Sequence, residues 1–270
     1  MKFKTLLSVS ALSIATFIGS AQAAIIPAMD FATKSGWLAD GVNSTTVVPT
    51  TGVVSDCAAG VSNATNGCGL TFSGASGIAG AYTDVTWGAS GKFSGLNVLS
   101  RSGTLVTNGG WVQTGLITHT NKPIPNTAKS LQNLDLATFF SLINPALFSD
   151  VGAAVGIKFT ETKNESNLNN CPTPQLSSVG CDDTFLVKLN LPDIKFVVDG
   201  NLYTIKFKLN PLAGVTQSVV NPDGSVVLVT KEDDVNQLEL LARLEVPAPA
   251  TVGLLGLSLL LVSASVRRRK

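Results

Sequence analysis

The sequence has few of the residues from which most catalytic and metal sites are built. One histidine and four cysteines occur in 270 residues, and charged residues make up 14% of the chain. A Cys-x-x-Cys pair is missing, so no zinc site of the usual spacing is indicated. A Gly-x-Ser-x-Gly elbow is also missing, which leaves a histidine-dependent hydrolase without its nucleophile motif. We therefore expect no catalytic residue, no metal ligand and no cofactor.

Calcium is the one ion for which the sequence offers ligands. The acidic pairs and runs Asp182–Asp183 and Glu232–Asp234 carry hard oxygen donors, but neither has the loop pattern of an EF-hand. We expect solvated turns at both places, with a structural Ca²⁺ site as the alternative.

Basic runs are confined to the two ends of the chain. Six of the nineteen Lys and Arg residues lie there: Lys2, Lys4, Arg267, Arg268, Arg269 and Lys270. The rest of the chain then carries thirteen basic residues against eighteen acidic ones. A mildly acidic body without a basic patch excludes nucleic acid as an expected partner.

The N-terminal segment has the order of a secretory signal peptide. Lys2 and Lys4 are followed by an apolar run from Leu6 to Ile18, and then by small residues at Ala21 and Ala23. Cleavage after Ala23 would leave Ala24 as the first residue. We predict that residues 1–23 are removed on export.

The C-terminal segment has the order of a membrane-directed sorting tail. No charged residue occurs from Ala250 to Val266, and at about 1.5 Å per residue a helix of this length nearly spans a bilayer core of about 30 Å. The basic cluster Arg267, Arg268, Arg269 and Lys270 then fixes the cytoplasmic side. We predict a transmembrane sorting helix within residues 247–270, and an ectodomain at residues 24–246 beyond the inner membrane.

This tail resembles the PEP-CTERM tail of exported Gram-negative proteins. Val246, Pro247, Ala248 and Pro249 stand at the expected motif, with Pro-Ala-Pro in place of Pro-Glu-Pro. The resemblance implies an exosortase-type enzyme as partner and only a transient stay in the inner membrane.

The four cysteines form two close pairs in sequence. Three pairings are possible, and local pairing is favoured because closing a short loop costs the least entropy. We predict the disulfides Cys57–Cys68 and Cys171–Cys181 in an oxidising compartment. Crossed pairs, free thiols and a metal site are the alternatives.

Alternation of apolar and polar residues dominates the body of the chain. It predicts strands near 81–87, 96–101, 111–118, 155–161, 185–191, 194–198, 203–209 and 226–231. Asp199-Gly200 between two such runs predicts a tight hairpin. Only Leu131–Leu147 could be a helix. The fold class expected is all-β, a single jelly-roll-like β-sandwich.

A short motif in the middle of the chain is more specific. Trp87-Gly88 and Gly110-Trp111 precede the segment GLITHTNKPI at residues 115–124. With Thr118, His119, Thr120 and Asn121, this segment resembles the THxN family of PEP-CTERM proteins. The resemblance implies an export route but no biochemical activity.

On a strand, His119 and Asn121 share one face, and Thr118 and Thr120 share the other. We expect His119 and Asn121 to hydrogen-bond loop backbone at the rim of the sandwich, so that His119→Asn costs about 1 kcal/mol. The alternatives are a glycan contact, with Trp87 or Trp111 as a stacking platform, and metal binding.

These patterns together predict an exported structural protein of the cell surface or extracellular matrix, associated with exopolysaccharide. A glycan-binding module is the alternative. A carbohydrate-active enzyme is a further one, because paired carboxylates of a glycosidase meet only in space.

Overall fold

The computed structural model describes residues 24–39, 70–89, 91–124, 131, 133–160, 162, 167–171, 175–188, 193–212, 214–222 and 225–247. The predicted signal segment through Ala23, the cysteines Cys57 and Cys68, and the tail from Ala248 onward lie outside these ranges. The predicted transmembrane helix therefore also lies outside them. Within the described ranges, no helix is long and apolar enough to cross a membrane.

The described residues form an all-β structure of fourteen strands and one 3₁₀ turn, η1 (Leu168–Asn170). The strands are β1 (Ala28–Leu38), β2 (Thr71–Ala75), β3 (Ala81–Ala89), β4 (Lys92–Ser100), β5 (Ser102–Val106), β6 (Val112–Thr120), β7 (Asn133–Asn144), β8 (Ala146–Thr160), β9 (Asp183–Lys188), β10 (Ile194–Val198), β11 (Asn201–Pro211), β12 (Val215–Val220), β13 (Val226–Thr230) and β14 (Val235–Glu245). Every pairing between two of these strands is antiparallel.

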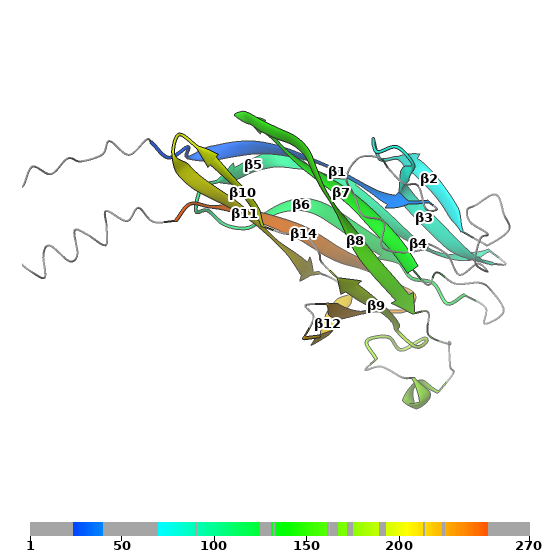
Figure 1. Cartoon of the computed structure of the whole chain (residues 1–270). Coiled ribbons are helices and arrows are strands. Elements are labelled where there is room, and N and C mark those ends of the chain that lie inside the picture. The colour runs from blue at the N-terminus through cyan, green and yellow to red at the C-terminus, as the bar shows by residue number, and fades with distance from the viewer. Residues whose placement is uncertain are drawn as a thin grey trace, which may run out of the picture.

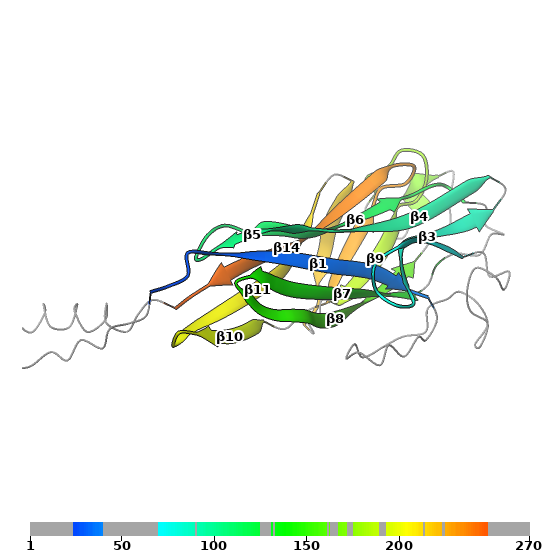
Figure 2. The same cartoon turned by 90° about the horizontal axis from the view of Figure 1, so that it is seen from above.

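The strands belong to one continuous sheet that curls over itself (Figures 1 and 2). Its order is β10-β11-β14-β6-β4-β3-β1-β7-β8-β9-β13-β12, with β2 added beside β3 and β5 beside β1. The largest core cluster joins Ile117 of β6 and Leu238 of β14 to Phe185 of β9 and Leu228 of β13, which are distant in strand order. The curl thus brings β6 and β14 face to face with β9 and β13, and this contact positions the candidate site.

The strand predictions are confirmed where one face of the strand is buried. Each of the eight predicted segments overlaps a strand of the structure. The hairpin is also confirmed, because Val198 pairs with Asn201 across Asp199 and Gly200. Both turn residues have positive φ, 48° and 78°, as a two-residue hairpin of this type requires.

The predicted helix at Leu131–Leu147 is wrong. This segment forms β7 and the start of β8, which pair with each other as a hairpin. β7 lies between β1 and β8 and is buried on both faces, with Leu134 and Leu136 in one core cluster and Phe139 in another. A strand buried on both faces lacks two-residue alternation, and its continuous apolar run resembles a helix.

The two ends of the described chain meet at one end of the molecule (Figure 1). The backbone N–H of Thr107 donates to the carbonyl of Pro27, and the next N–H, of Asn108, donates to the carbonyl of Leu244, both at 2.8 Å. The side chain of Asn108 then accepts from the N–H of Val246 at 2.9 Å. The turn after β5 therefore joins the residues that lead into β1 with those that leave β14.

Candidate functional site

His119 lies in an aromatic cluster of the core, not at a rim. Its ring stacks on Trp87, with centroids 5.8 Å apart and planes at 15°, and meets Phe159 and Phe185 edge-on at 5.6 and 4.9 Å. Its Nδ1 is 3.2 Å from the hydroxyl oxygen of Thr230. The side chain is 3% exposed, so His119 serves as a packed ring between the facing parts of the sheet.

The alternation of the motif is as the sequence predicts. His119 and Asn121 are buried, whereas Thr118 and Thr120 lie half-buried on the opposite face of β6. Burial lowers the pKa of His119 to about 3, since desolvation disfavours the imidazolium. A neutral, enclosed imidazole is a poor general base at neutral pH because it reaches no solvent-side substrate.

Asn121, at the end of β6, brings the motif to two buried acids. Asp183 begins β9, and Glu232 follows β13; both side chains are at most 1% exposed. The Asn121 amide is near enough to both carboxyl groups to lower the pKa of each. We call Asn121, Asp182, Asp183 and Glu232 the acidic site.

The prediction of solvated turns at these acids is corrected by this burial. Because of the turn at residues 231–234, only Glu232 points inward. Asp233 has φ 54° and forms an ion pair with Lys122 at 2.8 Å, while Asp234 pairs with Lys231 at 2.9 Å. The left-handed backbone at Asp233 thus separates one buried carboxyl from two exposed ones.

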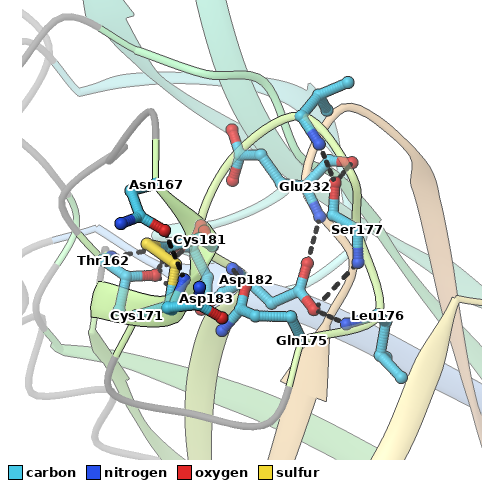
Figure 3. Close-up of a disulfide and its surroundings, with 12 residues drawn as sticks. Thr162, Asn167, Cys171, Gln175, Leu176, Ser177, Cys181, Asp182, Asp183 and Glu232 are labelled. Atoms are coloured by element: carbon cyan, nitrogen blue, oxygen red, sulfur yellow. Dashed lines mark hydrogen bonds between the residues drawn. A yellow bond between two sulfur atoms is a disulfide. The ribbon is translucent and has the colours of Figure 1, made fainter.

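The predicted disulfide Cys171–Cys181 is present and precedes the acidic site directly (Figure 3). Thr162 fastens this segment: its N–H donates to Oδ1 of Asp183 at 2.7 Å, and its hydroxyl lies 3.1 Å from the carbonyl oxygen of Cys181. The cross-link and Thr162 therefore fix the chain where Asp182 and Asp183 turn into the core.

Asp182 organises the loop rather than facing its acidic neighbours. Its carboxylate accepts from the backbone N–H groups of Leu176 and Ser177, and from that of Glu232 at 2.9 Å. The Glu232 side chain points away from this carboxylate (Figure 3). Asp182 thus links the disulfide loop to the turn after β13, and its charge is satisfied by backbone donors.

Burial governs the protonation of the other two acids. Desolvation raises the pKa of Asp183 to about 7, against the opposing hydrogen bonds from Thr162. Desolvation, followed by repulsion from Asp183, raises the pKa of Glu232 to about 8. Two adjacent buried carboxyl groups share a preference for the neutral form, so the site takes up protons or another positive charge readily.

Several polar atoms of the acidic site make no hydrogen bond to any described residue. They are both side-chain polar atoms of Asn121, Oδ2 of Asp183 and both carboxyl oxygens of Glu232. Buried polar atoms are normally paired, so this concentration is unusual. In the described ranges no three His, Cys, Asp or Glu side chains are grouped as metal ligands, and a metal here would need the Asn121 amide as well as two carboxylates.

Of the two tryptophans that the glycan alternative considers as a stacking platform, Trp87 is closed to a ligand. Trp87 is fully buried under His119, and the cavity of about 30 Å³ lined by His119 is far smaller than usual ligand pockets. The ring of Trp111 is half-buried, and Lys208 and Arg243 lie over it at 4.6 and 4.8 Å.

A polar pocket of about 260 Å³ lies at the end where both termini meet. Its lining includes Asn108, Thr204, Arg243, Glu245 and Pro247. Val246 is buried beside it, and Pro247 is exposed. Of the predicted sorting motif, only these two residues are described, and Val246 is the last residue of the described core.

Three residues of the site gave no signal in the sequence analysis. Asn236 accepts from the N–H of Lys231 at 2.8 Å and donates to the carbonyl of His119 at 3.3 Å, which ties the turn at 231–234 to β6. Thr162 and Thr230 contact the acids and His119 from other strands and loops. An isolated Asn or Thr has no local pattern, and only the folded contacts identify such residues.

Comparison of the chain with protein-family models and with curated proteins finds no match.

Proposed function

We propose that the chain is an exported, non-catalytic structural protein of the cell surface or extracellular matrix, delivered by an exosortase-type system. In this proposal residues 24–246 form a β-sandwich ectodomain of the THxN type, whose two layers are the facing parts of the curled sheet. The signal peptide starts export, and the tail holds the protein in the inner membrane until it is processed.

The position of the chain ends carries this proposal. Val246 is the last core residue of the described ranges, and the exposed Pro247 follows it at the same end of the molecule as Ala24. In this proposal, the points at which the two membrane-directed segments would join the ectodomain, Ala24 and Pro247, lie at one pole, and the rest of the body is free to project outward. The Cys171–Cys181 disulfide agrees with an oxidising compartment.

The burial of the THTN motif favours a structural role over catalysis. His119 and Asn121 join strands from facing parts of the sheet, and the imidazole is neutral and enclosed. A motif of this kind supports a particular fold, so its recurrence in a family needs no shared reaction.

The test is expression of the full chain in a Gram-negative host with and without an exosortase. With the enzyme, we expect intact-mass measurement of surface or medium fractions to show a product lacking the basic end. Without it, the full tail should remain in the inner-membrane fraction. A chain ending at Val246 is the matched control and should be released in both strains.

Exported protein that keeps Arg267–Lys270 in the strain with the enzyme would replace the sorting model by a plain membrane anchor. An enzymatic activity that His119→Phe abolishes without loss of folded structure would argue against the structural role.

A glycan-binding function is the second candidate, and the polar pocket favours it. Asn108, Thr204, Arg243 and Glu245 offer both donors and acceptors in a pocket of about 260 Å³, close to the lower size of small-ligand sites. Binding of exopolysaccharide fragments that Arg243→Ala weakens, while Arg101→Ala does not, would favour this function.

A further inference from the structure

Three side chains of the acidic site carry buried polar atoms that lie close to one another. Asn121, Asp183 and Glu232 come from the end of β6, the start of β9 and the turn after β13, and each is at most 1% exposed. The Asn121 amide lies near enough to act as a donor toward both carboxyl groups and to lower the pKa of each, but its atoms, Oδ2 of Asp183 and both oxygens of Glu232 have no partner within full hydrogen-bond geometry among described residues. The three groups are therefore neighbours in the core, but their polar atoms do not reach full hydrogen-bond geometry.

Burial of two ionised carboxyl groups lowers the stability of the fold unless a positive charge lies between them. Two neighbouring carboxyl groups removed from water must be neutralised by protons, a cationic side chain or a metal ion. The nearby lysines do not supply that charge, since Lys122 and Lys231 form their ion pairs outside, with Asp233 and Asp234.

We propose that Asp183, Glu232 and Asn121 form a binding site for one calcium ion. Two carboxylates and an amide oxygen are hard ligands of the type that Ca²⁺ prefers. The amide need only turn about its last side-chain bond to present oxygen instead of nitrogen. Oxygen atoms around a shared cation do not hydrogen-bond to one another, which accounts for their lack of partners.

Asp182 has a separate role in this site. Its carboxylate is taken by three backbone N–H groups, so it shapes the loop and adds negative potential rather than a ligand. This is why the described residues contain no group of three acidic or histidine side chains suited to a metal, although the acids are adjacent.

The ion would add a side-chain link among three segments that are already joined in pairs, by the bond from the N–H of Asn121 to the carbonyl of Asp234 and by the bond from the N–H of Glu232 to Asp182, both at 2.9 Å. It would connect the Thr118–Asn121 motif to Asp183, the first residue of β9, and to the turn at 231–234. Because these segments belong to facing parts of the curled sheet, occupation of the site stabilises the curl itself.

The experiment uses the full chain, purified in detergent and freed of metal with EDTA. We expect calorimetric titration with CaCl₂ to show one ion per chain with a Kd of about 10⁻⁴ to 10⁻³ M, the range of extracellular calcium modules. The melting temperature should rise with added Ca²⁺, and Mg²⁺ should act much more weakly.

Glu232→Gln is the test variant, since it keeps the size of a side chain that makes no hydrogen bond to described residues. We expect calcium affinity to fall at least tenfold while the metal-free melting temperature is kept or raised. Asp234→Asn, at an exposed ion pair two residues further along the chain, is the matched control and should bind like wild type.

Either of two results would overturn the proposal. Wild-type chain that takes up no Ca²⁺ at millimolar concentration would make the acids a neutral, proton-bearing pair. Unchanged calcium binding by Glu232→Gln would place the ion elsewhere.

Discussion

His119 illustrates how a single polar side chain can serve as a core residue. Its ring packs against Trp87, Phe159 and Phe185, and only Nδ1 finds a polar partner, the hydroxyl of Thr230. The energetic role of the ring is thus mainly packing. The cost of about 1 kcal/mol expected for His119→Asn from the sequence counts only one hydrogen bond. The packing of the ring adds to this cost, so the structure indicates a larger destabilisation.

Replacing His119 by Asn should destabilise the fold by about 2 to 4 kcal/mol, because the shorter side chain leaves a cavity among three aromatic rings. His119→Phe retains the stacked ring and loses only the contact with Thr230, so its cost should be clearly smaller. Urea unfolding of both variants measures the difference. If Asn were tolerated better than Phe, hydrogen bonding and not packing would dominate at this position.

At the scale of elements, sequence patterns predict strands with one buried face and fail for strands that differ from this type. The hairpin at Asp199-Gly200 follows from its turn residues. β7 is buried on both faces and resembles a helix. The sequence analysis does not predict β14, because its Leu, Glu and Ala residues favour helices. In the structure β14 pairs with both β11 and β6.

Only one part of the candidate site, the common face of His119 and Asn121, can be predicted from the sequence. The shared face of His119 and Asn121 follows from the two-residue period of a strand. Their meeting with Asp183 and Glu232 depends on how the sheet curls, and no local spacing records this contact. The inward turn of Glu232 beside two exposed acids likewise depends on the backbone at Asp233.

The disulfide loop before β9 gives the second prediction. Replacing Cys171 and Cys181 together by Ser should lower the free energy of unfolding by about 2 to 3 kcal/mol, the effect expected for a loop with a sequence separation of 10 residues. The loop also holds the donors to Asp182. Denaturant unfolding under non-reducing conditions checks this value.

Replacing Cys57 and Cys68 by Ser is the control. It removes the other predicted bridge and leaves the loop before β9 cross-linked. Peptide mapping of the wild type should show the two local pairs. A crossed pair, or an unfolding free energy that the Cys171 and Cys181 replacements leave unchanged, would contradict the proposed stapling of this loop.

For the whole molecule, the acidic site and His119 set opposite pH trends. In the folded state the pKa values of Asp183 and Glu232 are raised from 3.8 and 4.5 to about 7 and about 8. The folded state therefore holds protons that the unfolded state has released, and stability is lost as pH rises from about 4 to about 8. The lowered pKa of His119, about 3, means that stability is lost as pH falls below about 6.5. Because two carboxyl groups oppose one imidazole, their effect sets the direction in which stability changes with pH.

In EDTA, the melting temperature should therefore fall between about pH 5 and pH 8. Glu232→Gln removes one of the two acids, so its curve should be flatter over the same range. Differential scanning calorimetry measures both curves. A wild-type melting temperature that rises steadily across this range would show that the two carboxyl groups are not the dominant titrating pair.

The last prediction concerns where the folded body ends. β14 pairs with β11 through Leu244 and Glu245, and Val246 is a core residue held by Asn108, whereas Pro247 is exposed. A chain ending at Val246 should fold, remain soluble and melt within a few degrees of the full chain. A chain ending at Ala242 loses the buried Leu244 and Val246, and with them about 3 to 6 kcal/mol of apolar burial, so it should be largely unfolded. Circular dichroism and thermal melts distinguish the two. Aggregation of the longer chain would mean that the tail is part of the folded body rather than an appended sorting signal.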